Sequence, residues 1–126
     1  MWVQFFASNG DIAGSMAVNF ANPPQYWVGY CNSAWVDFAV NIPAEQVRIW
    51  TITETDTSVI LTCNGVEILN YLFSESTNDN CVPYWSITDA VKMQFDTHDS
   101  ASDEYRAQRT GMIIHRRCTM HHYWHN

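Results

Sequence analysis

An Asn-Gly pair at residues 64 and 65 separates two apolar runs and constrains the fold more than any other feature of this sequence. Both residues accept the positive φ angles of a type I′ turn, whose twist suits a two-residue β-hairpin. The predicted register pairs Cys63 with Val66, Leu61 with Ile68 and Val59 with Asn70 on one face, and Thr62 with Glu67, Ile60 with Leu69 and Ser58 with Tyr71 on the other. We expect the first face to pack on a second sheet, because it is the more apolar face near the turn.

The rest of the chain repeats this pattern of short aromatic or β-branched runs between turn residues, which is typical of a β-sandwich. The predicted strands are Trp2–Ala7, Gly14–Phe20, Tyr26–Tyr30, Ala34–Val40, Gln46–Thr53, Thr57–Asn64, Val66–Phe73, Ala90–Phe95 and Thr110–Arg117. Two short stretches, Ser86–Asp89 and Asp103–Gln108 after the N-cap Ser102, are the candidates for a helical turn, and neither is long enough to stand alone. A chain of 126 residues suits one core. The sequence therefore predicts an all-β fold, a two-sheet antiparallel β-sandwich that forms a single domain over residues 1–126.

The charge balance argues against two classes of partner. Six Lys and Arg face thirteen Asp and Glu, for a net charge of −7, which is the opposite of a nucleic-acid footprint or a patch for anionic lipid. No run approaches the roughly 20 apolar residues that span a bilayer. The start, Met1 to Gln4, lacks the features of a signal peptide, which fits a cytosolic protein or a secreted protein already processed.

Four cysteines, at positions 31, 63, 81 and 118, bear on the compartment. Their spacings contain no C-x-x-C, so zinc-ribbon and thioredoxin sites are not predicted. We expect Cys63 and Cys81 to form a disulfide that ties down the loop 74–80, while Cys31 and Cys118 pair with each other or Cys118 bridges two chains. Four buried free thiols in a cytosolic protein are the alternative. Disulfides would indicate an oxidising compartment.

Two clusters of side chains contain residue types that bind metal ions, but neither cluster has the pattern of a known metal site. His115, His121, His122 and His125 gather near the end of the chain, but neighbouring arginines repel a cation. A second cluster resembles a calcium site and consists of Asp96, Asp99, Asp103 and Glu104. The EF-hand pattern is missing, however, and Arg106 and Arg109 can form ion pairs with these acids. We therefore predict no metal and no cofactor.

The aromatic content points to binding. Six tryptophans are present, and Trp27, Trp35 and Trp50 lie inside strand runs, where we expect them in the core. Trp85 follows a loop rich in Asn and Asp, and a sugar binds on such a combination, with its C–H face on a ring and its hydroxyls on polar side chains. The predicted sugar-binding residues are Glu75, Asn78, Asp79, Asn80, Tyr84, Trp85, His98 and Asp99. A buried Trp85 under an ordinary loop is the alternative, and Tyr26-Trp27 is a rival aromatic floor.

The stretch from Val47 to Ala107 carries a resemblance to a known family. Its "CNGVE" hairpin, its second cysteine Cys81 and the run from Asp99 to Arg106, "DSASDEYR", resemble the farnesoic acid O-methyltransferase-like domains of invertebrates. Within that family the chain is similar to galactose-binding lectins of feather stars. In the shared run we expect Tyr105 in the core and Arg106 paired with an acid.

The resemblance implies a jelly-roll-like sandwich, secretion, and binding of terminal galactose or N-acetyllactosamine on glycoproteins and glycolipids, without catalysis. It does not imply methyl transfer, because the sequence has no recognisable cradle for a nucleotide-like methyl donor. Weak single sites would make a homodimer or higher oligomer useful. The alternatives are a protein-interaction or matrix module with an aromatic surface and, third, a small methyltransferase.

Overall fold

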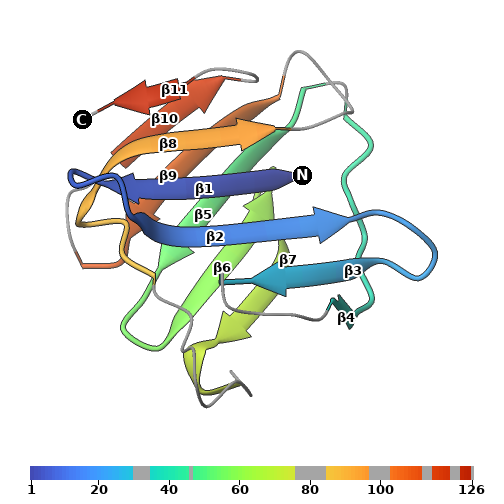
Figure 1. The fold of residues 1–126 in the computed structure, drawn as a ribbon. Coiled ribbons are helices and arrows are strands. Elements are labelled where there is room, and N and C mark those ends of the chain that lie inside the picture. The colour runs from blue at the N-terminus through green and yellow to red at the C-terminus, as the bar shows by residue number, and fades with distance from the viewer. Residues whose placement is uncertain are drawn as a thin grey trace.

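The computed structural model describes residues 1–29, 35–45, 47–75, 85–96, 103–111, 115–119 and 123–125. Two β-sheets stack face to face, with strands of one crossing behind strands of the other (Figure 1). The six-stranded sheet has the order β11 (Tyr123–His125), β8 (Ala90–Asp96), β1 (Trp2–Ala7), β2 (Ile12–Asn19), β3 (Gln25–Val28) and β4 (Val36–Asp37). The five-stranded sheet has the order β10 (His115–Thr119), β9 (Glu104–Arg109), β5 (Ile49–Glu54), β6 (Ser58–Cys63) and β7 (Val66–Leu72).

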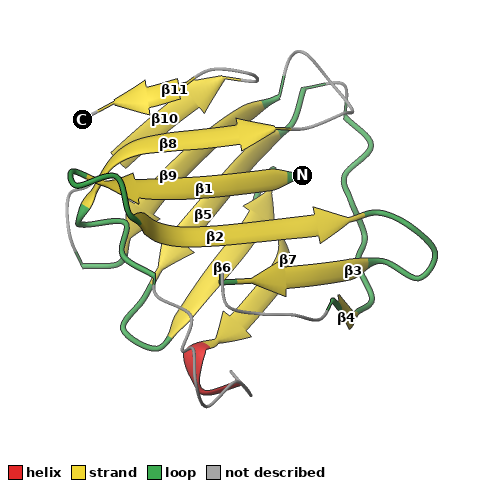
Figure 2. Cartoon of the chain, in the orientation of Figure 1, coloured by secondary structure: helices red, strands yellow, loops and turns green. Residues whose placement is uncertain are grey.

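This architecture confirms the predicted all-β sandwich. Among the described residues the helical content is one 3₁₀ turn, η1 (Phe73–Glu75), after β7 (Figure 2). Consecutive strands β1 to β4 and β5 to β7 are antiparallel neighbours, as short turns require. The pairing of β5 with β9 is parallel, which departs from the predicted antiparallel sheet.

The core lies between the sheets, where alternate residues of each strand meet. Its largest fully buried side chains include Phe5, Met16, Trp50, Ile52, Leu61, Phe95 and Tyr105. The Tyr105 ring stacks with Trp50 at a centroid distance of 6.2 Å and contacts Phe95 at 3.9 Å. Tyr105 is therefore in the core, as the shared sequence run predicts.

The hairpin of β6 and β7 follows the prediction near its turn and departs from it further away. Asn64 and Gly65 have φ angles of 49° and 81°, as a type I′ turn needs, and Cys63 pairs with Val66. A register shift next to Leu61 then pairs Leu61 with Leu69 instead of Ile68. An extra residue in one strand moves every later side chain to the other face.

The consequence of this bulge is visible in the burial of β7. Leu69 and Tyr71, which the uniform register places on the outer face, are 7% and 3% exposed and belong to the core. Asn70, predicted to face inward, is exposed. On β6 the predicted inward face is correct, because Val59, Leu61 and Cys63 are fully buried.

Neither of the two candidate stretches is helical in the structure. Residues 104–109 form β9, in which Tyr105 and Ala107 are buried and Arg106 is exposed, so the burial period is that of a strand. The Ser86–Asp89 stretch is a tight turn in which Asp89 N donates to Ser86 Oγ at 3.2 Å. The predicted strand Thr110–Arg117 is replaced by β10, and β11 was not predicted.

Two buried carboxylates tie the five-stranded sheet together. Asp103, fully buried, accepts hydrogen bonds from Arg48 Nε at 3.3 Å and Trp50 Nε1 at 3.1 Å, and Arg48 Nη2 lies 3.0 Å from its Oδ2. Glu54, 2% exposed, pairs with Arg109 Nη1 at 2.9 Å and accepts from Ile87 N at 3.2 Å. Burial raises the pKa of the Glu54 carboxyl, and the contacts with Arg109 and Ile87 N oppose that rise.

Candidate functional site

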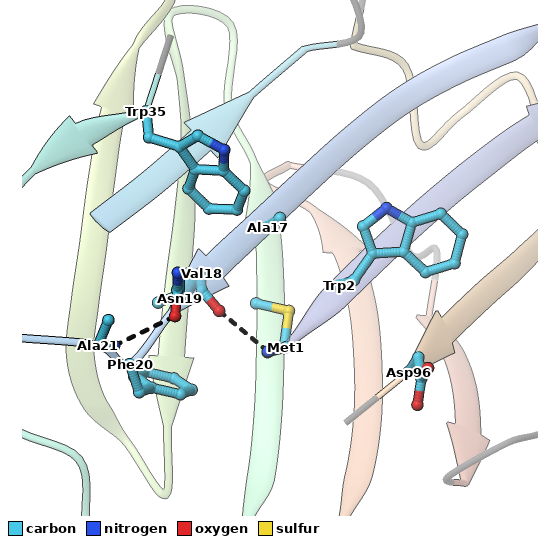
Figure 3. A pocket seen from close by; sticks show the side chains of 9 residues that line it. All are labelled: Met1, Trp2, Ala17, Val18, Asn19, Phe20, Ala21, Trp35 and Asp96. Carbon is cyan, nitrogen blue, oxygen red and sulfur yellow. Dashed lines mark hydrogen bonds between the residues drawn. The ribbon is translucent and has the colours of Figure 1, made fainter. Parts of the chain in front are cut away.

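A hollow of about 700 Å³ lies over the end of the six-stranded sheet where β1 begins and β2 and β8 end (Figure 3). We call it the tryptophan hollow. Its lining residues are Met1, Trp2, Ala17, Val18, Asn19, Phe20, Ala21, Trp35 and Asp96. Volumes of this size are ordinary for small-ligand sites.

Strand register explains how four distant residues come to one surface. Asp96, Trp2, Ala17 and Trp27 pair in turn across β8, β1, β2 and β3. The next set of partners along the same strands, Phe95, Val3, Met16 and Val28, is 0–2% exposed and belongs to the core. Successive side chains of a strand point to opposite faces. The first set, here called the outer row, therefore faces away from the core.

The hollow is walled by indole rings and floored by a small residue. In Figure 3, Trp35 and Trp2 stand on opposite sides of Ala17, and Asp96 lies beyond Trp2. Trp35 is 46% exposed and Trp2 is half-buried, whereas Ala17 is 7% exposed. A larger residue at 17 would occupy the space that the two indoles enclose.

Polar groups complete the lining. Asp96 supplies a half-buried carboxylate, and Asn19 is exposed at the end of β2. Asn19 Oδ1 accepts a hydrogen bond from Ala21 N at 3.2 Å, and the Met1 amine donates to Val18 O at 3.0 Å (Figure 3). Aromatic walls with a carboxylate and a carboxamide suit a ligand that has both a C–H face and hydroxyl groups.

The structure overturns the prediction for Trp85. Its ring is 8% exposed and meets Phe5 edge to face at a centroid distance of 5.4 Å. It also lies against Gly14, where an added Cβ would stand 2.9 Å from the indole Cε3. Trp85 is part of the core and offers no open face for a sugar.

Most of the other predicted sugar-binding residues lie outside the described part of the chain: Asn78, Asp79, Asn80, Tyr84, His98 and Asp99. Glu75 is described and exposed, and its carboxylate accepts a hydrogen bond from Leu72 N at 3.0 Å. The structure therefore does not bring Glu75 and Trp85 together as one floor.

The two residues of the alternative aromatic site, Tyr26 and Trp27, lie on opposite faces of β3. The Tyr26 ring packs edge to face on Phe38 and Tyr71, at centroid distances of 5.2 and 6.2 Å. Burial, with the negative charge of Glu75, raises the pKa of the Tyr26 hydroxyl. Trp27, by contrast, belongs to the outer row beside the tryptophan hollow.

None of the lining residues was among the predicted sugar-binding residues, and the two aromatic walls, Trp35 and Trp2, were missed for different reasons. Trp35 was expected in the core of a seven-residue strand, but β4 covers only Val36–Asp37, and Trp35 precedes it. Trp2 carried a usable signal, because the polar Gln4 lies between Val3 and Phe5, and Trp2 precedes Gln4 by two residues. In the structure Val3 and Phe5 are the buried residues of this strand. That alternation places Trp2 on the outer face of β1.

Two described acids of the acidic run, Asp103 and Glu104, pair with arginines. Asp103 is buried against Arg48 and Trp50, and Glu104 Oε1 pairs with Arg106 Nε at 3.0 Å, as expected for the shared run. Within the described ranges, no three His, Cys, Asp or Glu side chains gather as metal ligands. His98 and Asp99, and the side chains of the late histidines, lie outside them.

The predicted disulfide between Cys63 and Cys81 is not present. Cys63 is a free, fully buried thiol on the inner face of β6, where it pairs across the strands with Trp50. Cys31, Cys81 and the side chain of Cys118 are outside the described residues. Without a Cys63–Cys81 bridge, no disulfide among the described residues supports an oxidising compartment.

Cys63 is expected to resist alkylation in the native protein. Burial raises the pKa of the Cys63 thiol to about 11, so at neutral pH its thiolate population is roughly a hundredfold below that of an ordinary cysteine. Iodoacetamide followed by peptide mapping should leave Cys63 unmodified in buffer and modify it fully in guanidinium chloride. Rapid labelling in buffer would contradict both its burial and its raised pKa.

In the part of the chain that the structure describes, no helix has the length and apolar character to cross a membrane.

Comparisons of the chain with models of protein families, with curated proteins and with solved structures gave no match.

Proposed function

We propose that this protein is a non-enzymatic lectin that binds galactose-containing glycans in the tryptophan hollow. The observation that carries the proposal is the pair of indoles, Trp2 and Trp35, that flank the small Ala17 beside the carboxylate of Asp96. Galactose has one face of C–H groups, which gains dispersion and ring-electrostatic energy on an indole. Its hydroxyls both donate and accept, so a carboxylate and a carboxamide at the rim can orient it.

The finer preference for N-acetyllactosamine, together with secretion, rests on the resemblance of residues 47–107 to galactose-binding lectins. A single open site of this kind should bind weakly, with dissociation constants from about millimolar to micromolar. Cell-surface glycans are held firmly by such sites only when several bind at once. A homodimer or higher oligomer is therefore part of the proposal, with glycoproteins or glycolipids as partners.

Alanine at Trp35 or Trp2 is expected to weaken binding of lactose by about threefold to tenfold, because each change removes one stacking surface. Titration of the ¹⁵N-labelled protein with lactose, followed by NMR, measures the affinity. Leu72→Ala is the matched control, since Leu72 is 44% exposed, close to the 46% of Trp35, but lies on β7 of the other sheet.

Each outcome of this titration decides something. If neither lactose nor N-acetyllactosamine shifts any signal of the wild-type protein, the protein is not a galactose lectin. The hypothesis of an aromatic surface that binds a protein partner is then the better supported one. Binding that survives both tryptophan changes unaltered would place the sugar outside the tryptophan hollow.

A further inference from the structure

The outer row continues beyond the tryptophan hollow. Asp96, Trp2 and Ala17 line the hollow, and the fourth member of the row, Trp27, pairs directly with Ala17 on the next strand. Trp27 is half-buried, so part of its surface remains accessible. Trp2 on β1 and Trp27 on β3 thus stand on either side of one small residue.

The spacing of the backbone positions that carry these two indoles follows from the sheet. Neighbouring strands lie about 4.8 Å apart, so two strand spacings separate Trp2 from Trp27 by roughly 10 Å. Two rings that clamp a single flat ligand stand only about 7–8 Å apart, which is two contact distances. Indoles that project from backbone positions this far apart are better matched to two successive units of a chain than to one ring held between them.

Amide side chains flank the outer row on both sides. Gln94 and Gln4 pair across β8 and β1 two residues further along, and Asn19 and Gln25 pair across β2 and β3 two residues in the other direction. Residues two apart on a strand lie about 6–7 Å apart on the same face. Gln25 Nε2 is held by Asp37 Oδ1 at 2.7 Å. Carboxamides both donate and accept hydrogen bonds, as a line of sugar hydroxyls requires.

The charges along this surface favour a neutral ligand. Asp96 ends the outer row on β8, and Asp37 lies on β4 beside Gln25, so a carboxylate stands toward each end. A sialic acid or sulfate placed along the row would meet like charge. Lys92, the basic residue of β8, pairs instead with Phe6 and lies 4.6 Å from the centre of the Phe6 ring.

We propose that the outer row is an extended groove that takes a neutral oligosaccharide lengthwise, across the strands. The terminal unit lies in the tryptophan hollow, and a unit further along the chain contacts Trp27. This inference rests on the proposed function, because it assigns additional units of the same glycan to the same face of the sheet.

The test is the dependence of affinity on chain length. Calorimetry of the wild-type protein should show a linear tetrasaccharide of two N-acetyllactosamine units binding about threefold to tenfold more tightly than the disaccharide. Trp27→Ala should bring this ratio close to one, whereas Leu72→Ala should leave it unchanged. A tetrasaccharide capped with sialic acid should lose the gain in affinity.

Two failures are distinguishable. If neither sugar binds the wild-type protein, the proposed function is wrong, and the inference of an extended groove is wrong as well. If the disaccharide binds but the tetrasaccharide binds equally well, or if Trp27→Ala leaves the ratio as it is, only the extended groove is overturned. Should Trp27→Ala fail to fold, the indole NMR signal of Trp27 in the wild-type protein decides, because the tetrasaccharide should shift it more than the disaccharide does.

Discussion

Replacing Asp103 by alanine is expected to lower the free energy of unfolding by about 3–5 kcal/mol. The carboxylate is fully buried and is held by the guanidinium of Arg48 and the indole N–H of Trp50. Its removal leaves Arg48, 12% exposed, as a poorly solvated charge without this counterion, and it strands a buried donor on Trp50. Urea unfolding followed by tryptophan fluorescence measures the loss.

Glu104→Ala supplies the matched control for Asp103. Glu104 is the next residue along the chain, and its side chain is 15% exposed while that of its partner Arg106 is 48% exposed. Solvent therefore reaches the guanidinium and screens the pair, so the loss of this pair should cost under about 1 kcal/mol. Equal effects of the two substitutions would show that the burial of Asp103 does not determine its contribution. The comparison thus separates a fully buried carboxylate from a partly exposed one at adjacent positions of the chain.

Trp85→Ala is expected to destabilise the fold by about 3–5 kcal/mol, because it empties a core position that Phe5 and Gly14 surround. The same substitution at Trp35, which is 46% exposed, should cost under about 1 kcal/mol. Thermal unfolding monitored by circular dichroism compares the two variants directly. A Trp85 variant as stable as the Trp35 variant would contradict the assignment of Trp85 to the core.

The difference in burial between Trp85 and Trp35 also determines how a loss of sugar binding should be interpreted for each variant. A Trp85 variant that fails to bind a sugar will have lost packing between the sheets, so its loss of binding identifies no contact. A Trp35 variant keeps the core intact, and its loss of binding is informative.

The fold was largely predictable because its signals are local. Asn64-Gly65 determines a turn within four residues, and the pairs nearest to it, Cys63 with Val66 and Thr62 with Glu67, were correctly predicted. The bulge beyond them was not predictable, since it depends on which of Ile68, Leu69 and Tyr71 the other sheet can accommodate. Side-chain packing between the sheets therefore sets the register where turn chemistry no longer does.

The candidate site was harder to predict because it depends on pairing between distant strands. Composition drew attention to Trp85, whose neighbours in sequence are polar, yet its neighbours in space are Phe5 and Gly14. Trp2, Trp35 and Asp96 are far apart in the sequence and meet only through the order β8-β1-β2-β3-β4. A sequence shows which residues can bind a sugar, whereas strand order decides which of them meet.

The parallel β5–β9 pair has a consequence for how the chain is made. It joins Trp50 to Tyr105, so the five-stranded sheet lacks half of its strand contacts at β5 until most of the polypeptide has left the ribosome. The β6–β7 hairpin needs only residues that are close in sequence, so it can form early and pair with β5. The other edge of β5 is then still unpaired. During synthesis from the N-terminus, one edge of β5 therefore stays unpaired until β9 has emerged.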